Sequence, residues 1–542
     1  MTEKITGLCF KNMVSYGINN LEKYCDVVND LNVFPVPDGD TGTNMVMTLK
    51  TGLQALSDKD EPLSLVAQSF ANGTVFGARG NSGVIISQFF KGVGEGFKTA
   101  DVADCALFSK ALETGCSYAY AAVAKPVEGT VLTVIKDASN ALKENLKNTA
   151  SIEEAVSVLL GKARTSLERT PDLLAILAKA GVVDSGGAGF VYFLEGVQRY
   201  LNGEKIEAVE SAAETAQYID YSVFNRNSSF EYGYCTETLL QLTVAEDEFD
   251  GDAFLAELKE LGESLVVSFE GDKVKLHIHT PTPEKVLAFC HNYGEFLSLK
   301  IENMSVQNVQ TSQKYLCVPP QEDNNFAIVA VAPNGLLQKM FSEMGADVSV
   351  MSEEVPASQD FVEAFERVTA KEILVFPNNS NSILSAMQAG KLYKNANITV
   401  VNCRTVAQCY SAMAVIDFDE TDIDTVVETV NEAIDNIYEV DVVRAVRDSR
   451  YGDIEIVKGD YFSMAGDDVL RTGDSIESIV LGTIDEVMQK SDYNVINLFY
   501  GQAVSLQQME SLEEQIRELR RDVEVCLIST QDAIYDLILS FE

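Results

Sequence analysis

The sequence is poor in histidine, in paired cysteines and in long apolar runs. Its 542 residues include three histidines, His277, His279 and His291, so chemistry that depends on histidine has few candidates and none before position 277. The ten cysteines are scattered without a Cys-x-x-Cys pair, which is typical of free thiols in a cytoplasmic protein. No run is apolar for long enough to span a bilayer, and the opening Met-Thr-Glu-Lys lacks a signal-peptide core. We therefore expect a cytoplasmic protein with no integral membrane segment.

Two further absences narrow the class of protein. The pattern GxxxxGK[ST] does not occur, which excludes the P-loop class of nucleotide-binding proteins. Basic residues are half as common as acidic ones, 41 against 82, and the formal net charge is −41. Such a charge opposes nonspecific binding to nucleic acid or to an anionic membrane surface, so we expect no nucleic-acid partner. The length predicts about two to four domains.

The spacing of apolar residues divides the chain into three parts. Residues 5–201 follow a helical period, most clearly over 107–123 and 152–167, and contain no convincing alternating strand. A polar stretch at 202–221 marks a boundary. The next part has strand patterns at 234–244 and 265–280 and helical patterns at 252–261 and 281–292, which together predict a small α+β unit.

The last part begins after a turn-rich segment at 317–325. Short apolar runs alternate here with helical patterns, which predicts an α/β domain with a parallel sheet and right-handed crossovers. The expected strands are 326–332, 373–376, 398–402, 495–500 and 523–529, and the expected helices are 335–344, 380–389, 406–414 and 506–519.

An acidic loop stands out from Asn32 to Asn44, with the sequence Asn-Val-Phe-Pro-Val-Pro-Asp-Gly-Asp-Thr-Gly-Thr-Asn. Asp38 and Asp40 lie one residue apart, on a segment that two prolines stiffen. Carboxylates this close repel each other and favour a bound cation, and oxygen ligands of this kind suit a Mg²⁺ ion that bridges to phosphates. A helix beginning at Thr43 or Asn44 would place phosphate near its positive end. The alternative is an Asx-rich turn that caps that helix.

This loop resembles the nucleotide-binding motif of the dihydroxyacetone-kinase L-domain family, and more closely that of the kinase subunit of the bacterial two-component fatty acid kinase. Two later segments resemble the same family in order and spacing: Gly77-Ala-Arg-Gly-Asn-Ser-Gly83 and Val183-Asp-Ser-Gly-Gly-Ala-Gly-Phe190. The resemblance runs along the whole chain and implies a multidomain protein. Its parts would be an all-α helical barrel of the L-domain type that binds ATP (1–205), a small α+β middle domain (206–320) and an α/β domain similar to the DegV-type lipid-carrier fold (321–542).

The resemblance also implies a function. The chain would use ATP to phosphorylate a fatty acid presented by a separate DegV-type fatty-acid-binding carrier protein, giving an acyl phosphate for phospholipid synthesis. The implied cofactors are ATP and Mg²⁺, expected as two ions, and the implied assembly is a homodimer. Two alternatives stay open: a kinase subunit of the dihydroxyacetone type, and a non-enzymatic regulator with the same fold. The dihydroxyacetone system relies on a histidine in a separate domain that we do not find here, and the intact pair Asp38 and Asp40 argues against a regulator.

The resemblance assigns the residues of the nucleotide site. Asp38 and Asp40 would be the catalytic carboxylates and the Mg²⁺ ligands, with Asn32 as a third oxygen ligand at a position where the family often has aspartate. Asp184 is expected near the ribose or base, and Arg79 either reaches a phosphate or pairs with an acid. The other expected nucleotide contacts are Thr41, Thr43, Asn44, Asn81, Ser82, Gly83, Thr130 and Gly186. Asn81 or Ser82 could also be an ordinary cap of the helix that follows. Residues 184–189 could instead form the end of a helix and a turn.

A second candidate site lies in the middle part, at Val274-Lys-Leu-His-Ile-His-Thr280. Strand alternation places His277 and His279 on one face, and Cys235 could add a thiolate from a neighbouring strand. A Cys/His/His set favours Zn²⁺, and the fatty acid kinase family is similar in bearing a middle-domain metal. The alternative is a pair of half-exposed strand histidines. Water or Glu237 could be the fourth ligand, and the role of the metal stays open between structural and catalytic.

One loop of the last part, Pro377-Asn-Asn-Ser-Asn-Ser382, follows an expected strand and opens an expected helix. Ligands of α/β sheets bind at such places, although simple capping of the helix explains the asparagines and serines at least as well. No Gly-rich dinucleotide fingerprint follows the first strand at Phe326. By resemblance, this domain would be a surface on which the carrier docks.

Overall fold

The structure of the chain is a computed structural model. It describes residues 2–32, 39–57, 59, 61–123, 125–204, 234–243, 249–270, 272–303, 314–318, 325–352, 354–445, 448–451, 454–466, 468–530 and 536–542. The chain forms two compact units, one made of Met1–Ser211 with Leu316–Glu542 and the other of Ala212–Tyr315. Among the described residues, nine cysteines are free thiols, as the sequence predicts. None of the described helices combines the length and the apolar character needed to cross a membrane.

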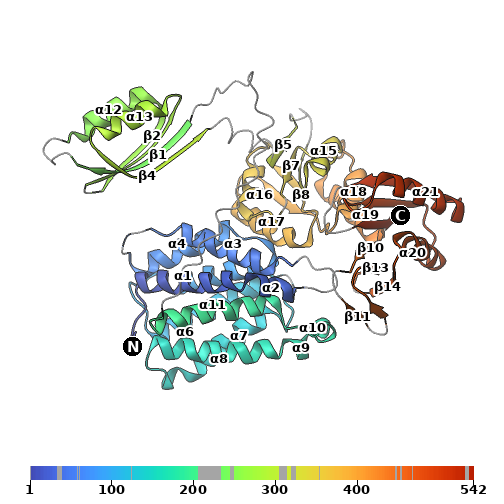
Figure 1. The fold of residues 1–542 in the computed structure, drawn as a ribbon, viewed down its shortest axis with the longest axis horizontal. Helices are drawn as coiled ribbons and strands as arrows, with labels where there is room; N and C mark the ends of the chain where they lie inside the picture. The colour runs from blue at the N-terminus through green and yellow to red at the C-terminus, as the bar shows by residue number, and fades with distance from the viewer. Residues whose placement is uncertain are drawn as a thin grey trace. The chain divides into compact units, whose positions relative to one another are not determined.

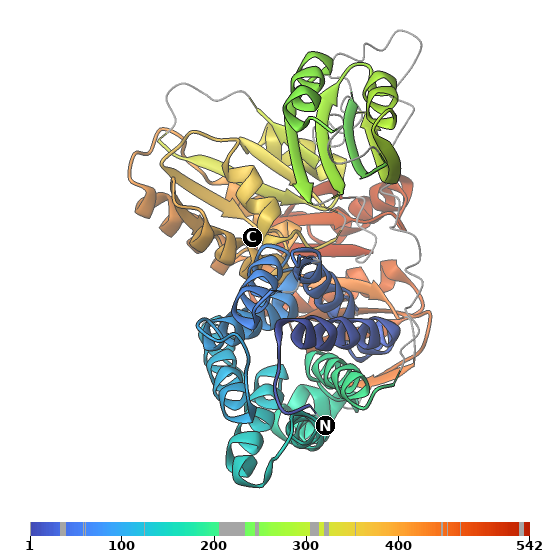
Figure 2. The ribbon, with the colours of Figure 1, turned by 90° about the vertical axis from the view of Figure 1, so that its left-hand side faces the viewer.

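The N-terminal part is built from helices, which confirms the predicted all-α class (Figures 1 and 2). Apart from one isolated bridge between Ile5 and Ala103, its described residues form no strand. The helices are α1 (Gly7–Lys23), α2 (Cys25–Leu31), α3 (Thr41–Gln54), α4 (Leu63–Phe76), α5 (Gly80–Gly96), α6 (Cys105–Ala121), α7 (Val131–Asn145), α8 (Ile152–Glu168), α9 (Thr170–Leu173), α10 (Ala175–Ala180) and α11 (Ser185–Leu201), with a 3₁₀ turn at Leu146–Asn148.

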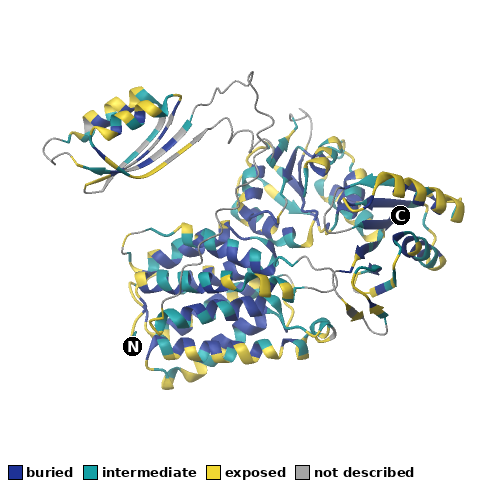
Figure 3. Ribbon diagram, in the orientation of Figure 1, coloured by how far each residue is buried: buried dark blue, intermediate teal, exposed yellow. Residues whose placement is uncertain are grey.

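Seven of these helices close a ring. Helix α1 packs on α4, and the contacts continue through α5, α6, α7, α8 and α11 back to α1. Each helix turns its apolar stripe inward, so buried residues line the inside of the ring and exposed residues its outside (Figure 3). The interior retains an apolar cavity of about 50 Å³, with Phe89, Phe90, Phe190 and Phe193 among its lining residues.

The middle unit is a small α+β structure, as predicted. Its four-stranded antiparallel sheet has the order β2-β3-β1-β4, and the helices α12 (Gly251–Leu261) and α13 (Pro283–His291) lie on one face of it (Figure 1). Phe254 and Leu258 of α12 and Val286 of α13 are fully buried against that face. The strands are β1 (Tyr234–Leu242), β2 (Glu263–Glu270), β3 (Lys273–Thr280) and β4 (Gly294–Asn303).

The C-terminal part opens with a five-stranded sheet in the order β5-β7-β6-β8-β9. Strand β6 pairs in parallel with β7 and β8, and β8 pairs in parallel with β9, which confirms the predicted parallel sheet. All six residues of β6 are buried, as expected for a central parallel strand. The elements are β5 (Tyr315–Cys317), β6 (Ala327–Ala332), α15 (Gly335–Glu343), β7 (Val348–Met351), α16 (Ser358–Phe365), β8 (Glu372–Phe376), α17 (Ser380–Leu392), β9 (Asn397–Val400), α18 (Val406–Ala414) and α19 (Ile423–Asn436).

A second sheet of six strands follows, in the order β14-β13-β10-β17-β15-β16. Only the pair β15 and β16 is parallel; the other pairings in this sheet are antiparallel. The parallel pair of β15 and β16 confirms the strands expected at 495–500 and 523–529. The antiparallel strands of this sheet were not expected from the sequence. The elements are β10 (Tyr438–Arg444), β13 (Tyr461–Ala465), β14 (Asp468–Gly473), α20 (Ile476–Lys490), β15 (Val495–Tyr500), α21 (Leu506–Leu519), β16 (Glu524–Ser529) and β17 (Leu537–Phe541), with a hairpin of β11 (Ser449–Tyr451) and β12 (Ile454–Ile456).

Candidate functional site

The last four residues of the acidic loop, Thr41 to Asn44, form the first turn of helix α3. Asp40 is the residue that precedes this helix, and its side chain makes no capping hydrogen bond to it. One carboxylate oxygen of Asp40 instead accepts a hydrogen bond from the side-chain amide of Asn381, at 3.2 Å. Asp38 lies outside the described residues. Asn32, the expected third ligand, ends helix α2, where its backbone N–H donates to the carbonyl of Asn29 at 3.0 Å.

Asn29 supplies the cap that Asp40 does not. Its Oδ1 accepts from the backbone N–H of Gly42 at 2.7 Å and of Thr43 at 3.2 Å, and its Nδ2 donates to the Thr43 hydroxyl at 3.0 Å. Helix α3 begins at Thr41, so the expected start at Thr43 or Asn44 is wrong. No local sequence pattern points to Asn29, because a cap from a residue 13 or 14 positions upstream depends on how α2 packs against α3.

Two glycines let the start of α5 approach α3. Gly80 has φ of +62°, and a Cβ atom there would lie 2.5 Å from Nδ2 of the buried Asn44. A Cβ atom at Gly83 would lie 2.4 Å from the Thr48 hydroxyl. Helix α5 begins at Gly80 after Arg79, which makes no side-chain cap. Asn81 and Ser82 thus lie in the first turn of the helix, and the reading of either as its cap is wrong.

The start of α11 meets the start of α3. Asp184 caps α11, since its Oδ2 accepts from the Gly187 N–H at 2.7 Å. The hydroxyl of Ser185, the next residue, donates to the Thr41 hydroxyl at 3.2 Å. The chain at Gly186 passes close to α7, because a Cβ atom at this glycine would lie 3.2 Å from the Val131 Cβ. The N-terminal ends of α3, α5 and α11 are therefore neighbours, and helix N-termini attract anions such as phosphate.

Burial raises the pKa of the Asp184 carboxyl to about 6, although the backbone N–H groups of Gly187 and Val131 oppose the shift. This carboxylate holds the first turns of α11 and α7 together. The expectation that it lies near the ribose or base stays a prediction.

The raised pKa of Asp184 predicts a pH effect on stability. Because the folded state favours the protonated carboxyl, its contribution is fully present below the ordinary pKa of 3.8 and is lost as pH rises through about 6. Asp184→Asn keeps an oxygen that can cap α11 but removes the charge. Without nucleotide, the thermal midpoint of this variant minus that of the wild type should be a few degrees greater at pH 7.5 than at pH 5. A difference that stays constant over this range would contradict the prediction.

Arg79 lies between the N-terminal helices and the C-terminal domain. Its backbone N–H donates to the Thr48 hydroxyl at 3.2 Å, and its guanidinium donates to the carbonyl of Val355 at 3.4 Å. The same group lies 3.6 Å from the carboxylate of Glu354. One of the two expectations for Arg79, that its side chain pairs with an acid, is therefore confirmed.

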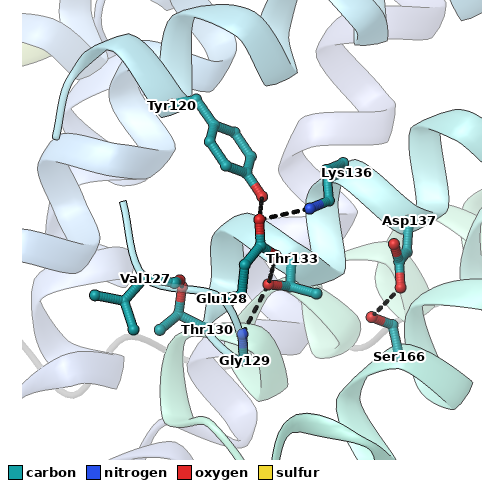
Figure 4. A network of polar contacts seen from close by, with 9 residues as sticks. All are labelled: Tyr120, Val127, Glu128, Gly129, Thr130, Thr133, Lys136, Asp137 and Ser166. Atoms are coloured by element: carbon teal, nitrogen blue, oxygen red, sulfur yellow. Dashed lines mark hydrogen bonds and ion pairs between the residues drawn. The ribbon is translucent and has the colours of Figure 1, made fainter. Parts of the chain in front are cut away.

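The loop before α7 is held by Glu128. Figure 4 shows Tyr120, Thr133 and Lys136 converging on this carboxylate, with distances of 3.2, 2.6 and 2.6 Å. The bonds from Lys136 and Thr133 lower the pKa of Glu128, so it stays ionised and keeps the loop in place. Thr130, the expected phosphate contact, precedes α7 without capping it, and its hydroxyl donates to the Val127 carbonyl at 2.8 Å.

The strand register of the middle unit bears on the candidate zinc site. Cys235 of β1 is directly opposite His279 of β3, and Glu237 is opposite His277. The residues that alternate with the histidines in β3, Leu276 and Ile278, are buried, as the alternation predicts. The expected neighbouring-strand position of Cys235 is therefore confirmed. On the other side of β1, Glu302 of β4 also pairs with Cys235, a position that the sequence analysis missed because the β1–β4 register is not local.

In the part of the chain that the structure describes, no cluster of three or more His, Cys, Asp or Glu residues is arranged to hold a metal ion. Asp38 and the side chains of Cys235, His277 and His279 lie outside the part of the chain that the structure describes.

Some solved structures align with part of this chain. The dihydroxyacetone kinase of C. freundii, in complex with AMP-PNP and Mg²⁺, aligns with 35% of this chain and 33% of its own at 20% identity and a TM-score of 0.28. The fatty acid kinase B3 protein of Streptococcus pneumoniae, loaded with linoleic acid, aligns with 40% of this chain and 99% of its own at 15% identity and a TM-score of 0.31.

Sequence relatives cover the chain from end to end. An uncharacterised protein of Staphylococcus aureus strain bovine RF122 / ET3-1 is 32% identical over 551 residues and aligns along the full length of both chains. The DAK2 domain model matches residues 35–199. The middle-domain and C-terminal models of the FakA-like fatty acid kinase proteins match residues 231–311 and 327–542. The resemblance found in the sequence motifs is thereby confirmed, and the chain belongs to the FakA-like fatty acid kinase family.

Proposed function

We propose that this protein is a cytoplasmic, ATP-dependent kinase that phosphorylates the carboxyl group of a fatty acid, which a separate carrier protein of the DegV type presents. The product is an acyl phosphate for phospholipid synthesis. The observation that carries the proposal is the meeting of three helix N-termini, those of α3, α5 and α11, beside the acidic loop, in a chain of the FakA-like fatty acid kinase family. Oriented N–H groups and carboxylates together suit a metal-bound polyphosphate.

The residues at these helix starts fit ATP and Mg²⁺. The carboxylate of Asp40 is a hard oxygen ligand, and the neutral amide of Asn381 contacts it. Asp38, Asp40 and Asn32 would hold Mg²⁺, which we expect as two ions, and the metal would offset the charge of the phosphates. The first turns of α3, α5 and α11 would supply the expected nucleotide contacts: Thr41, Thr43, Asn44, Asn81, Ser82, Gly83 and Gly186, with Thr130 from the loop before α7.

A carboxyl acceptor suits a site without histidine. A fatty acid carboxyl has a pKa of roughly 4 to 5, judged from side-chain carboxyls, and is ionised at neutral pH. Its oxygen attacks the γ-phosphorus of ATP, the bond from that phosphorus to the β,γ-bridging oxygen breaks, and ADP leaves. No proton has to be removed from the acceptor, so no general base is needed. The main task of the site is to reduce the repulsion between two anions.

The small apolar cavity inside the helical ring supports the proposal of a separate carrier. Its apolar cavity of about 50 Å³ holds only a few water-sized molecules, far less than a long acyl chain. The net charge of −41 also opposes extraction of the fatty acid from an anionic membrane. A separate protein would therefore shield the acyl chain and present its carboxylate.

We also propose that the kinase acts as a homodimer.

The test supplies the full-length protein with MgATP and compares three acceptors: a fatty acid bound to a DegV-type carrier, the same fatty acid alone, and dihydroxyacetone. We expect ADP and acyl phosphate to form quickly only with the loaded carrier. Phosphorylation of dihydroxyacetone instead would establish the alternative kinase. Absence of ADP formation with every acceptor would favour a regulator of the same fold.

We further propose that Cys235, His277 and His279 bind Zn²⁺, supported by the register that pairs Cys235 with His279. Replacing any of the three by alanine should lower the zinc content of the purified protein, measured by elemental analysis. If the metal is structural, the middle unit should also unfold at a lower temperature; if it is catalytic, activity should fall while the unit stays folded. His291→Ala is the matched control, since His291 ends α13 away from these strand positions, and it should leave the zinc content unchanged. A natively purified wild type without zinc would remove this site.

A further inference from the structure

Helix α17 of the C-terminal domain packs along α5 of the kinase domain. Two side-chain pairs join them: the Asn81 amide donates to Oδ1 of Asn381 at 3.1 Å, and the Gln88 amide donates to Oε1 of Gln388 at 2.8 Å. Both helices advance by seven residues between the two contacts, so they run in the same direction. The N-terminus of α17 therefore lies at the same end as the N-terminus of α5.

Further hydrogen bonds hold the two helices in this contact. Gln388 is buried, and its amide donates to the carbonyl of Val75 at 2.6 Å. The backbone N–H of Ser358, at the start of α16, donates to the carbonyl of Ala78 at 3.1 Å. With the Arg79 contacts described above, these bonds fix the C-terminal domain against the segment that leads into α5.

The loop that opens α17 is itself held tightly. Asn378 adopts φ of 55°, a left-handed conformation that a side chain makes costly. Asn379 caps the helix, with its Oδ1 accepting from the Asn381 N–H at 2.7 Å. Capping is thus confirmed for this loop, as the sequence analysis considered, but it involves Asn379 and leaves the side chain of Asn381 to point elsewhere.

Asn381 joins two parts of the candidate kinase site. Its Nδ2 donates to Oδ2 of Asp40 at 3.2 Å, while its Oδ1 accepts from Asn81. An amide can do both at once because it carries a donor and an acceptor. As a neutral donor, it can orient the carboxylate of Asp40 without competing for a cation as an ammonium or guanidinium group would.

We propose that Asn381 is a positioning residue of the kinase site, so that the C-terminal domain completes the site that the N-terminal helices begin. Asn381 fixes the rotation of the Asp40 carboxylate, which would bind Mg²⁺, and holds the side chain of Asn81 in the first turn of α5. Partners that orient metal ligands in this way typically change metal affinity or activity by about 10 to 100-fold when removed. The inference rests on the proposed role of Asp40 in binding Mg²⁺.

The experiment compares Asn381→Leu with Gln388→Leu in the full-length protein. Both replace an amide by an apolar group of similar size, on one helix and at one interface, but only Asn381 contacts Asp40. For each variant, the Mg²⁺ concentration that gives half-maximal binding of ADP is measured, together with kcat, KM for ATP and the thermal midpoint.

Asn381→Leu should raise the half-maximal Mg²⁺ concentration about 10-fold or more and lower kcat, with a thermal midpoint close to that of the wild type. Gln388→Leu should lower the thermal midpoint, because it leaves the Val75 carbonyl unpaired, and should keep the Mg²⁺ requirement of the wild type. An unchanged Mg²⁺ requirement in Asn381→Leu, equal shifts in both variants, or a rise in kcat would each overturn the proposal. The last result would show that the contact restrains the kinase instead.

Binding of ADP with Mg²⁺ separates this inference from the proposed acceptor. A Mg²⁺ shift in Asn381→Leu would support the positioning role even if the wild type phosphorylates no fatty acid. An active fatty acid kinase whose Mg²⁺ requirement does not depend on Asn381 would keep the proposed function and remove the positioning role.

Discussion

Asp40→Ala should lower kcat for phosphoryl transfer by about 10³-fold, because metal ions contribute several kcal/mol to stabilising the charge of such a transition state. Asp38→Ala should have a similar effect. Stability should change little in Asp40→Ala, since Asn29, not Asp40, caps helix α3. Steady-state kinetics at saturating Mg²⁺ and a thermal melt test the two halves of this expectation.

The matched control is Asp30→Ala. Asp30 is an exposed carboxylate on α2, close to the same loop in sequence, so its removal changes the local charge equally without touching the site. It should retain the activity of the wild type. Near-normal turnover by Asp40→Ala would exclude Asp40 as a metal ligand, and a loss of activity in Asp30→Ala would point to the general charge of the loop.

Gly196→Ala should destabilise the kinase domain by about 3 kcal/mol or more, the upper range for an overpacked core. Helices α1 and α11 cross here at close range. A Cβ atom at Gly196 would lie 2.2 Å from the carbonyl oxygen of Tyr16 and 2.8 Å from the Cα atom of Gly17. Both are backbone atoms, so no side-chain rotation can relieve the clash, and the two helices would have to separate. Denaturation followed by circular dichroism measures the change.

Gly161→Ala is the control for this effect. Gly161 lies within helix α8 on an exposed face, and a Cβ atom there would meet nothing within 4 Å. The same added methyl group should stabilise this helix by roughly 0.5–1 kcal/mol, because alanine loses less backbone entropy on folding than glycine. If the two variants changed stability alike, the close crossing of α1 and α11 could not be the cause.

Local sequence patterns correctly predicted the helices and strands whose own residues show a capping side chain or a clear apolar period. The strand 495–500 and the helices 406–414 and 506–519 match β15, α18 and α21 in the structure residue for residue. Both helices follow a residue whose hydroxyl caps them, Thr405 and Ser505, and both have a clear apolar period. The strands β10 to β14 were missed, because antiparallel pairing joins short runs of mixed polarity and depends on partners distant in sequence.

The candidate site shows the same contrast between features that local sequence predicts and features that depend on tertiary packing. The motifs located the loops around Asp40, Gly80 and Asp184, and the structure brings the helices that follow these loops together. The sequence could not show that Asn29 caps α3, nor that Asn381 contacts Asp40, since both depend on tertiary packing. It therefore misplaced the start of α3, and it treated the Asn381 loop as an unrelated ligand site or a plain cap.

The hydrogen bond between Asp40 and Asn381 joins residues 341 positions apart, which bears on how the protein is made. Domains fold largely in order as the chain leaves the ribosome, at about 5–20 residues per second. Asp40 therefore precedes Asn381 by roughly 20 to 70 s of synthesis. During that time the helical ring can fold, but the acidic loop lacks its amide partner. A nascent or truncated chain would thus carry the folded helical ring without the hydrogen bond from Asn381 to Asp40, which would form only after the α17 segment has been synthesised.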